Sequence, residues 1–130
     1  MSMKEEPHLV YSCRYHIAFC PKYRRPVLMG DREYRLREIL HDIAEKKGFQ
    51  ICETEIMPDY VHLIIDCSPR YGVLRCISDL KMESASIMRK EFPELKRRLP
   101  CMWNRYAFVA TVGTYDMMDL CRFYENQKGK

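Results

Sequence analysis

The sequence predicts an α+β protein whose antiparallel sheet is of the ferredoxin-like or RRM-like type, with helices on one face and a further helix at the C-terminus. Three observations lead to this fold class: short alternating segments predict strands, two longer segments have helical periodicity, and their order is β-α-β-β-α-β. The 130 residues fit a single domain, placed at 10–130 after a loose arm at 1–9. The expected strands are 10–20, 49–56, 60–66 and 106–112, and the expected helices are 32–47, 72–91 and 115–127.

Composition limits the class of protein and its compartment. Hydrophobic residues make up 47% of the chain, which excludes a disordered or fibrous protein. No apolar run approaches the ~20 residues that span a bilayer, and residues 1–7 lack the apolar stretch of a signal peptide. Seven cysteines without CxxC pairs indicate a reducing, cytoplasmic setting and no cysteine metal cluster. A net charge of +4 permits a polyanionic partner without requiring one.

The first strand and the loop after it carry candidate binding residues. Within residues 10–20, His16 alternates with Tyr15 and Ile17 and so faces the opposite side of the sheet; a lone strand histidine is more often structural than catalytic. The loop at 21–30 places three cations around one aromatic ring, a combination that suits phosphate contact with base stacking. A solvated basic loop is the alternative. These loop residues are Lys22, Tyr23, Arg24 and Arg25.

The two middle helices are interpreted as scaffold. Asp31 is a candidate N-cap for the first helix, and Gly48 can end it. On the second helix, Lys81 is an exposed candidate for phosphate contact, although such charges usually form a solvated face. Trp103, the single tryptophan, is either a core anchor or a stacking platform, and the sequence favours neither.

The strand at 60–66 and the last helix hold the candidate chemistry. Tyr60 and His62 share one face of the strand, whereas Val61 belongs to the core face. On the last helix Met117, Leu120, Cys121 and Tyr124 form one apolar stripe, and Phe123 and Gln127, four residues apart, share a different face.

These stretches resemble the single-tyrosine HUH transposases of the insertion sequence 200/605 type, the IS200-like family. That family usually has histidine, an apolar residue and histidine where this chain has Tyr60, Val61 and His62, and a nucleophilic tyrosine where this chain has Phe123. The resemblance covers nearly the whole chain. Its motifs are Tyr15–Pro26, Met57–Asp66, Phe108–Gly113 and Glu125–Gln127.

The resemblance implies a specific reaction. A tyrosine attacks a phosphate at the foot of a single-stranded DNA hairpin, a 5′-phosphotyrosine link forms, and a 3′-hydroxyl leaves. A Mg²⁺ or Mn²⁺ ion assists this attack by polarising and orienting the phosphate. In the family, two imidazoles and an amide oxygen hold the ion. Here the implied ligands are His62 and Gln127, with Tyr60 a poor third, because a phenol is neutral at pH 7. The resemblance also implies a homodimer joined edge to edge.

Two losses define the alternatives for function. Phe123 has no hydroxyl, and Tyr124 is an unlikely substitute because a rotation of about 100° on the helix turns it onto the packing stripe; Tyr60 is the other candidate nucleophile. We therefore expect a transposase-family protein for hairpin recognition and strand rejoining, with impaired or absent chemistry. The alternatives are an inactive regulator that binds DNA or RNA hairpins and a decayed copy with little activity.

Overall fold

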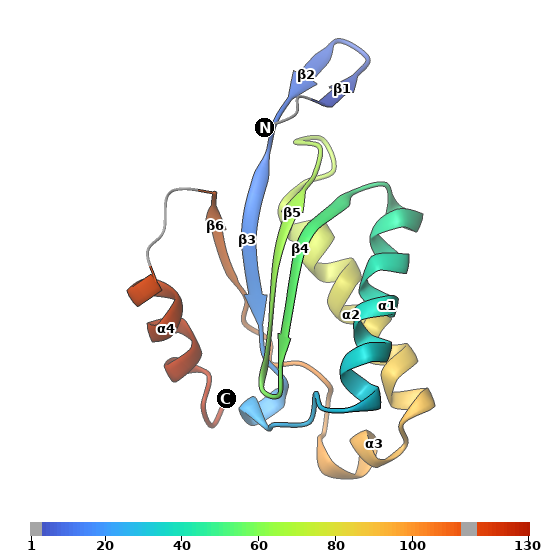
Figure 1. The fold of residues 1–130 in the computed structure, drawn as a ribbon, viewed down its shortest axis with the longest axis vertical. Coiled ribbons are helices and arrows are strands. Elements are labelled where there is room, and N and C mark those ends of the chain that lie inside the picture. Colours follow the sequence, from blue (N-terminus) through green and yellow to red (C-terminus); the bar gives the residue numbers. More distant parts are fainter. Residues whose placement is uncertain (1–3, 113–116) are drawn as a thin grey trace.

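A four-stranded antiparallel sheet forms the centre of the protein in the computed structural model, which describes residues 4–112 and 117–130, with the backbone alone for 117–120 (Figure 1). The sheet order is β4-β5-β3-β6, so the first and third strands of the β-α-β-β-α-β unit lie at its centre. This is the ferredoxin-like order, and the predicted fold class is confirmed. The strands are β3 (Arg14–Phe19), β4 (Gln50–Met57), β5 (Tyr60–Asp66) and β6 (Phe108–Thr111).

Helices cover the two faces of the sheet unequally. Helices α1 (Asp31–Lys47) and α2 (Val73–Glu91) pack on one face, and α4 (Met117–Asn126) lies on the other (Figure 1). Burial follows this division, because Ile17 and Val61 are fully buried in the main core whereas Ala18 belongs to a smaller cluster under α4. The face of β5 that carries Tyr60 and His62 therefore looks away from α1 and α2.

The ends of α1 follow from two glycines. Gly48 adopts the left-handed conformation (φ 87°) and its amide donates to the Ala44 carbonyl, as the sequence predicted. At the other end the cap position is Gly30 (φ 63°), and Asp31 is the first helical residue instead of the cap. A carboxylate in the first turn still favours the helix, because it lies near the positive end of the helix dipole.

The N-terminal arm is more ordered than predicted. Residues 4–11 form a two-stranded hairpin of β1 (Lys4–Glu6) and β2 (Leu9–Tyr11), where a loose arm over 1–9 was expected. The Ser68 hydroxyl donates to Glu6 at 2.6 Å, and Arg70 donates to the Pro7 carbonyl at 2.8 Å. These long-range contacts explain the order, and local sequence patterns do not reveal them.

The region after α2 contains one unpredicted helix and one core anchor. Short helix α3 (Glu94–Arg98) places Leu95 in the core and includes the basic run 96–98. Trp103 is 6% exposed, meets the Phe19 ring edge to face at 4.8 Å between centroids, and donates to the Ser84 hydroxyl at 3.0 Å. Trp103 is thus a core anchor. The expected start of the last helix at 115 lies outside the described residues.

Candidate functional site

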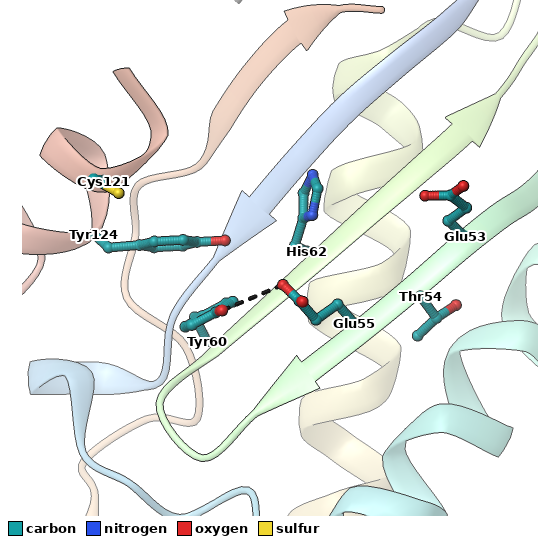
Figure 2. Close-up of a pocket in the computed structure, with 7 residues that line it drawn as sticks. All are labelled: Glu53, Thr54, Glu55, Tyr60, His62, Cys121 and Tyr124. Atoms are coloured by element: carbon teal, nitrogen blue, oxygen red, sulfur yellow. Dashed lines mark hydrogen bonds between the residues drawn. The ribbon is translucent and has the colours of Figure 1, made fainter. Parts of the chain in front are cut away.

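A pocket of about 690 Å³ opens between strands β4 and β5 and helix α4, on the face away from α1 and α2 (Figure 2). Strand β4 contributes two acidic side chains, β5 contributes an aromatic ring and an imidazole, and α4 contributes a thiol and a phenol. The lining residues are Glu53, Thr54, Glu55, Tyr60, His62, Cys121 and Tyr124.

Tyr60 lies at the floor of the pocket as a protonated phenol. Its hydroxyl donates to Glu55 at 3.2 Å, and its ring stacks on the Tyr124 ring at 4.1 Å with an angle of 28° between planes. Burial and the carboxylate of Glu55 raise the pKa of Tyr60 to about 12. A phenol held in this way is a weak metal ligand and a weak nucleophile near neutral pH.

His62 is paired with the imidazole of His16, for which the sequence favoured a structural role. Its Nε2 lies 3.1 Å from Nδ1 of His16 on the neighbouring strand β3. Burial lowers the pKa of both imidazoles, and for His62 the nearby Glu55 carboxylate works in the opposite direction. Alternation had placed His16 on this face, but only the β3–β5 register, with Ala18 opposite His62, brings the two rings together.

Helix α4 directs Tyr124 into the pocket. The nucleophile position that the resemblance implies is residue 123, one position earlier. Tyr124 is 8% exposed and reaches from α4 towards the sheet above Tyr60 (Figure 2). The ring of Phe123 packs against Phe108 at 5.5 Å between centroids. Tyr124 and Cys121 share a face, as expected, but that face looks into the pocket; the side chains of the other stripe members, Met117 and Leu120, lie outside the described residues.

Of the three metal ligands implied by the resemblance, two line the pocket and one does not. Tyr60 and His62 line the pocket, whereas Gln127 is buried (4% exposed) and is not part of the lining. The Gln127 Oε1 is buried without a hydrogen bond. Among the described residues no three histidine, cysteine or acidic side chains are grouped to hold a metal. With one imidazole, one amide oxygen and one neutral phenol, His62, Gln127 and Tyr60 offer Mg²⁺ few of the oxygen ligands that it prefers.

In the basic loop, Arg24 is turned into the protein, whereas Tyr23 and Arg25 are exposed and Lys22 is half-buried. A short 3₁₀ turn (Lys22–Arg24) gives Tyr23 and Arg24 positive φ values of 61° and 53°. Tyr23 is 41% exposed, with the Lys22 ammonium 5.1 Å and the Arg25 guanidinium 6.0 Å from its ring centroid. These three residues keep the arrangement that suits nucleic-acid contact.

The side chains of Arg24 and Lys81 bond to other groups of the protein. Arg24 forms an ion pair with Asp59 at 2.8 Å and donates to the Tyr124 carbonyl at 2.5 Å. Lys81 donates to the carbonyls of Asn104 and Tyr106 at 2.6 and 3.2 Å, and burial lowers its pKa. In this structure both cations are engaged by protein groups, and their assignment as phosphate ligands stays a prediction from sequence.

Replacing Arg24 by alanine should destabilise the protein by about 2 kcal/mol, because charge-assisted hydrogen bonds of a largely buried guanidinium are lost. Only 12% of the Arg24 side chain is exposed, so water cannot replace these bonds freely. Urea unfolding would measure the change. The control is Arg25→Ala, which removes an equal charge from an exposed side chain and should cost less than about 0.5 kcal/mol. Equal losses of stability for the two substitutions would contradict a stabilising role of the Arg24 guanidinium inside the protein.

Comparisons with known proteins agree across sequence and structure. The profile of the family described as "Transposase IS200 like" matches residues 9–127. The ISDra2 transposase TnpA of Deinococcus radiodurans is 33% identical over 132 residues, which covers 100% of this chain and 94% of the relative. A transposase for insertion sequence element IS200 of Salmonella typhimurium is 33% identical over 112 residues, covering 85% of this chain and 74% of the relative.

Two solved structures share the fold. A crystal structure of a putative transposase from Deinococcus radiodurans has a TM-score of 0.91 and 34% identity, and the match covers 98% of this chain and all of the other. A REP-associated tyrosine transposase bound to a REP hairpin has a TM-score of 0.57 at 13% identity, covering 96% of this chain and 69% of the other. The second similarity supports the fold alone.

Proposed function

This chain belongs to the IS200-like transposase family, and we propose that it binds the hairpin of a single-stranded DNA end while its own strand-cleavage chemistry is impaired. The observation that carries the proposal is the composition of the pocket. Among the described residues, its lining contains two carboxylates and no lysine or arginine, and the residue at the expected nucleophile position, Phe123, has no hydroxyl. A phosphate entering this pocket meets negative charge instead of the cations that stabilise phosphoryl transfer.

The basic loop supports hairpin binding on the outside of the pocket. Tyr23 and Arg25 are exposed and Lys22 is half-buried, so the loop offers charge beside an aromatic ring. The contacts of Arg24 with Asp59 and α4 tie the loop to the site. Phosphates would pair with the two cations, and an unpaired base would stack on the ring.

Replacing Lys22 and Arg25 together by alanine should weaken hairpin binding and flatten its salt dependence. Each phosphate contact on single-stranded DNA contributes about 0.7 to the slope of log affinity against log salt, so losing two should reduce the slope by about 1.4. Fluorescence anisotropy with the labelled hairpin from the element's own DNA end, at several salt concentrations, measures both quantities.

The matched control for this loop removes two positive charges elsewhere. Lys46 and Lys47 on α1 contact Glu83 on α2, in the helical layer on the face of the sheet opposite to α4. Their double alanine variant should bind nearly as the parent does. If both double variants lose the same affinity, net charge alone explains binding and the loop has no specific role.

A second candidate function is strand cleavage by a displaced nucleophile. Tyr124 supports it, because its ring lines the same pocket as His62. Such a reaction would attach DNA to Tyr124 instead of position 123. The covalent assay described in the Discussion separates this candidate from the proposal.

Two further features of the family belong to the proposal. We expect Mg²⁺ or Mn²⁺ to bind the free protein weakly, since the neutral phenol of Tyr60 replaces one of the two imidazoles that the family uses. We also propose a homodimer joined at the sheet edge: within the described part of the chain, β6 pairs with β3 on one side and has no partner strand on the other. An unpaired strand edge is a template for another chain.

A further inference from the structure

We propose that Arg105, Tyr106 and Lys130 form a second contact surface for DNA beside the basic loop, and that this surface binds unpaired nucleotides next to the hairpin stem. The inference rests on the proposed binding of a DNA hairpin and names the part of that DNA which this surface takes. Its ligand is an unpaired base stacked on an exposed ring, with the adjoining phosphate beside a cation.

Tyr106 repeats the combination of ring and cation found in the basic loop. Its side chain is 51% exposed, the Lys130 ammonium lies 5.0 Å from the ring centroid, and the neighbouring Arg105 is exposed as well. At Tyr23, which is 41% exposed, the cations of the basic loop take the same place beside the ring. An exposed ring with an adjacent cation suits base stacking together with phosphate contact.

The backbone that carries Tyr106 is held in place by the protein itself. The side chain of Asn104 is buried, and its Oδ1 accepts a hydrogen bond from the Tyr106 amide at 2.8 Å. The Lys81 ammonium donates to the carbonyls of Asn104 and Tyr106 at 2.6 and 3.2 Å. A ring on a fixed backbone loses little conformational freedom when a ligand binds, which favours affinity.

This second surface adjoins the basic loop. The Lys130 carbonyl accepts hydrogen bonds from the Tyr23 amide at 2.8 Å and from the side-chain amide of Asn104, so Lys130 contacts both surfaces. In Figure 1 the C-terminal residues lie beside the loop that follows β3. A DNA strand that contacts Tyr23 can therefore continue to Tyr106 over neighbouring parts of the protein.

A groove of about 270 Å³ between α2 and the segment at 101–105 extends the second surface. Among the described residues, its lining contains three basic side chains, Lys81, Arg89 and Arg105, and no acidic one. Lys81 and Arg89 also bond to protein carbonyls, but their charges still contribute to the local potential. The groove therefore favours phosphate, whereas the pocket at Tyr60 contains two carboxylates.

The exposed rings select unpaired nucleotides over the stem. Bases in a duplex stack on one another, whereas an unpaired base offers its face to an aromatic side chain. Stacking of this kind tolerates any base, so we expect this surface to show little sequence preference.

Fluorescence anisotropy compares the labelled hairpin alone with the same hairpin carrying about six unpaired thymidines on its 5′ or its 3′ side. We expect the parent to bind one of the tailed probes more tightly than the bare hairpin. Tyr106→Ala should weaken binding of that tailed probe by at least about fivefold and leave binding of the bare hairpin unchanged. Tyr106→Phe keeps the ring and should bind as the parent does. Lys130→Ala should reduce the salt slope for the tailed probe by about 0.7.

Tyr34→Ala is the matched control for loss of an exposed tyrosine. Tyr34 is 69% exposed and lies on α1, in the helical layer on the other face of the sheet from α4. This variant should bind every probe as the parent does. An equal loss in Tyr34→Ala and Tyr106→Ala would contradict a specific role for Tyr106.

Two results would overturn the inference and leave hairpin binding standing: a parent that binds tailed and bare hairpins equally, or a Tyr106→Ala variant with unchanged affinity for the tailed probe. A parent that binds no hairpin would overturn the proposed function and this inference with it. Loss of a dimer in Tyr106→Ala, measured by size-exclusion chromatography, would place the ring at a contact between two copies and also overturn the inference.

Photo-crosslinking of the parent gives the answer without mutation if Tyr106→Ala does not fold. A tailed hairpin with iodouracil in place of the tail thymines should crosslink to the peptide that contains Tyr106, because a stacked aromatic ring lies within reach of the excited base. Crosslinks that omit this peptide would refute the contact.

Discussion

Replacing Trp103 by alanine should destabilise the protein by about 3–5 kcal/mol, a large part of the stability of a domain of this size. The indole is 6% exposed, meets Phe19 edge to face, and its Nε1 donates to the buried hydroxyl of Ser84. Truncation leaves a cavity in the main core and a buried hydroxyl without its donor. Urea unfolding followed by circular dichroism measures the loss.

Phenylalanine is the matched substitution at this position. Trp103→Phe keeps an aromatic ring against Phe19 and removes only the hydrogen bond and part of the volume, so it should cost about 1–2 kcal/mol. The stacking-platform alternative makes the opposite prediction: Trp103→Ala would leave stability unchanged and weaken hairpin binding. That outcome would show that the indole faces DNA in solution.

Hydrophobic patterning predicted the elements of this fold because each one buries a face with a regular period. Alternation along β5 placed Val61 on the core side and His62 on the other side, and both assignments hold in the structure. Gly48 ends α1 through a local conformational requirement, which sequence also reveals. The N-terminal hairpin and α3 were missed because contacts with distant residues, such as Glu6 with Ser68, stabilise them.

The pocket was harder to predict because it depends on how elements meet. Sequence placed His16 on the correct face, but its contact with His62 follows from the offset between β3 and β5, which no local pattern encodes. Arg24 was grouped with its basic neighbours, yet its side chain lies under α4 and bonds to the Tyr124 carbonyl. The periodicity of α4 correctly placed Tyr124 and Cys121 on one face of the helix. That this face lines the pocket depends on how α4 packs on the sheet, which periodicity does not reveal.

The parent protein should form no covalent adduct with its own DNA hairpin end, and Tyr60→His combined with Phe123→Tyr should restore one. Covalent attachment needs a phenolic oxygen that replaces the 3′-oxygen on phosphorus, and the 3′-hydroxyl then leaves. Phe123 lacks that oxygen, and the Tyr60 phenol is held by Glu55. Restoring a nucleophile typically changes such rates by ~10³-fold or more, so the adduct should go from undetectable to a visible gel shift.

The structure bears differently on these two changes. A histidine at position 60 would lie on the same face of β5 as His62, two residues away, so two imidazoles could face one site. Phe123 belongs to the cluster with Tyr60 and Ala18, and Ala18 lies opposite His62 in the register of β3 and β5. Phe123 itself packs on Phe108 and is not among the residues that line the pocket, so a tyrosine at this position has to turn its hydroxyl towards His62 to act. Either single change lacks one of the two parts and should restore little.

Denaturing electrophoresis with a labelled hairpin, with and without Mn²⁺, detects the adduct as protein shifted by attached DNA. Adding Tyr124→Phe to the double variant is the matched control, and it should leave the adduct in place. An adduct formed by the parent and abolished by Tyr124→Phe would instead identify Tyr124 as a displaced nucleophile. Since Tyr124 lines the pocket beside His62 and its hydroxyl is buried, that result would make this chain an active transposase with its chemistry moved by one residue.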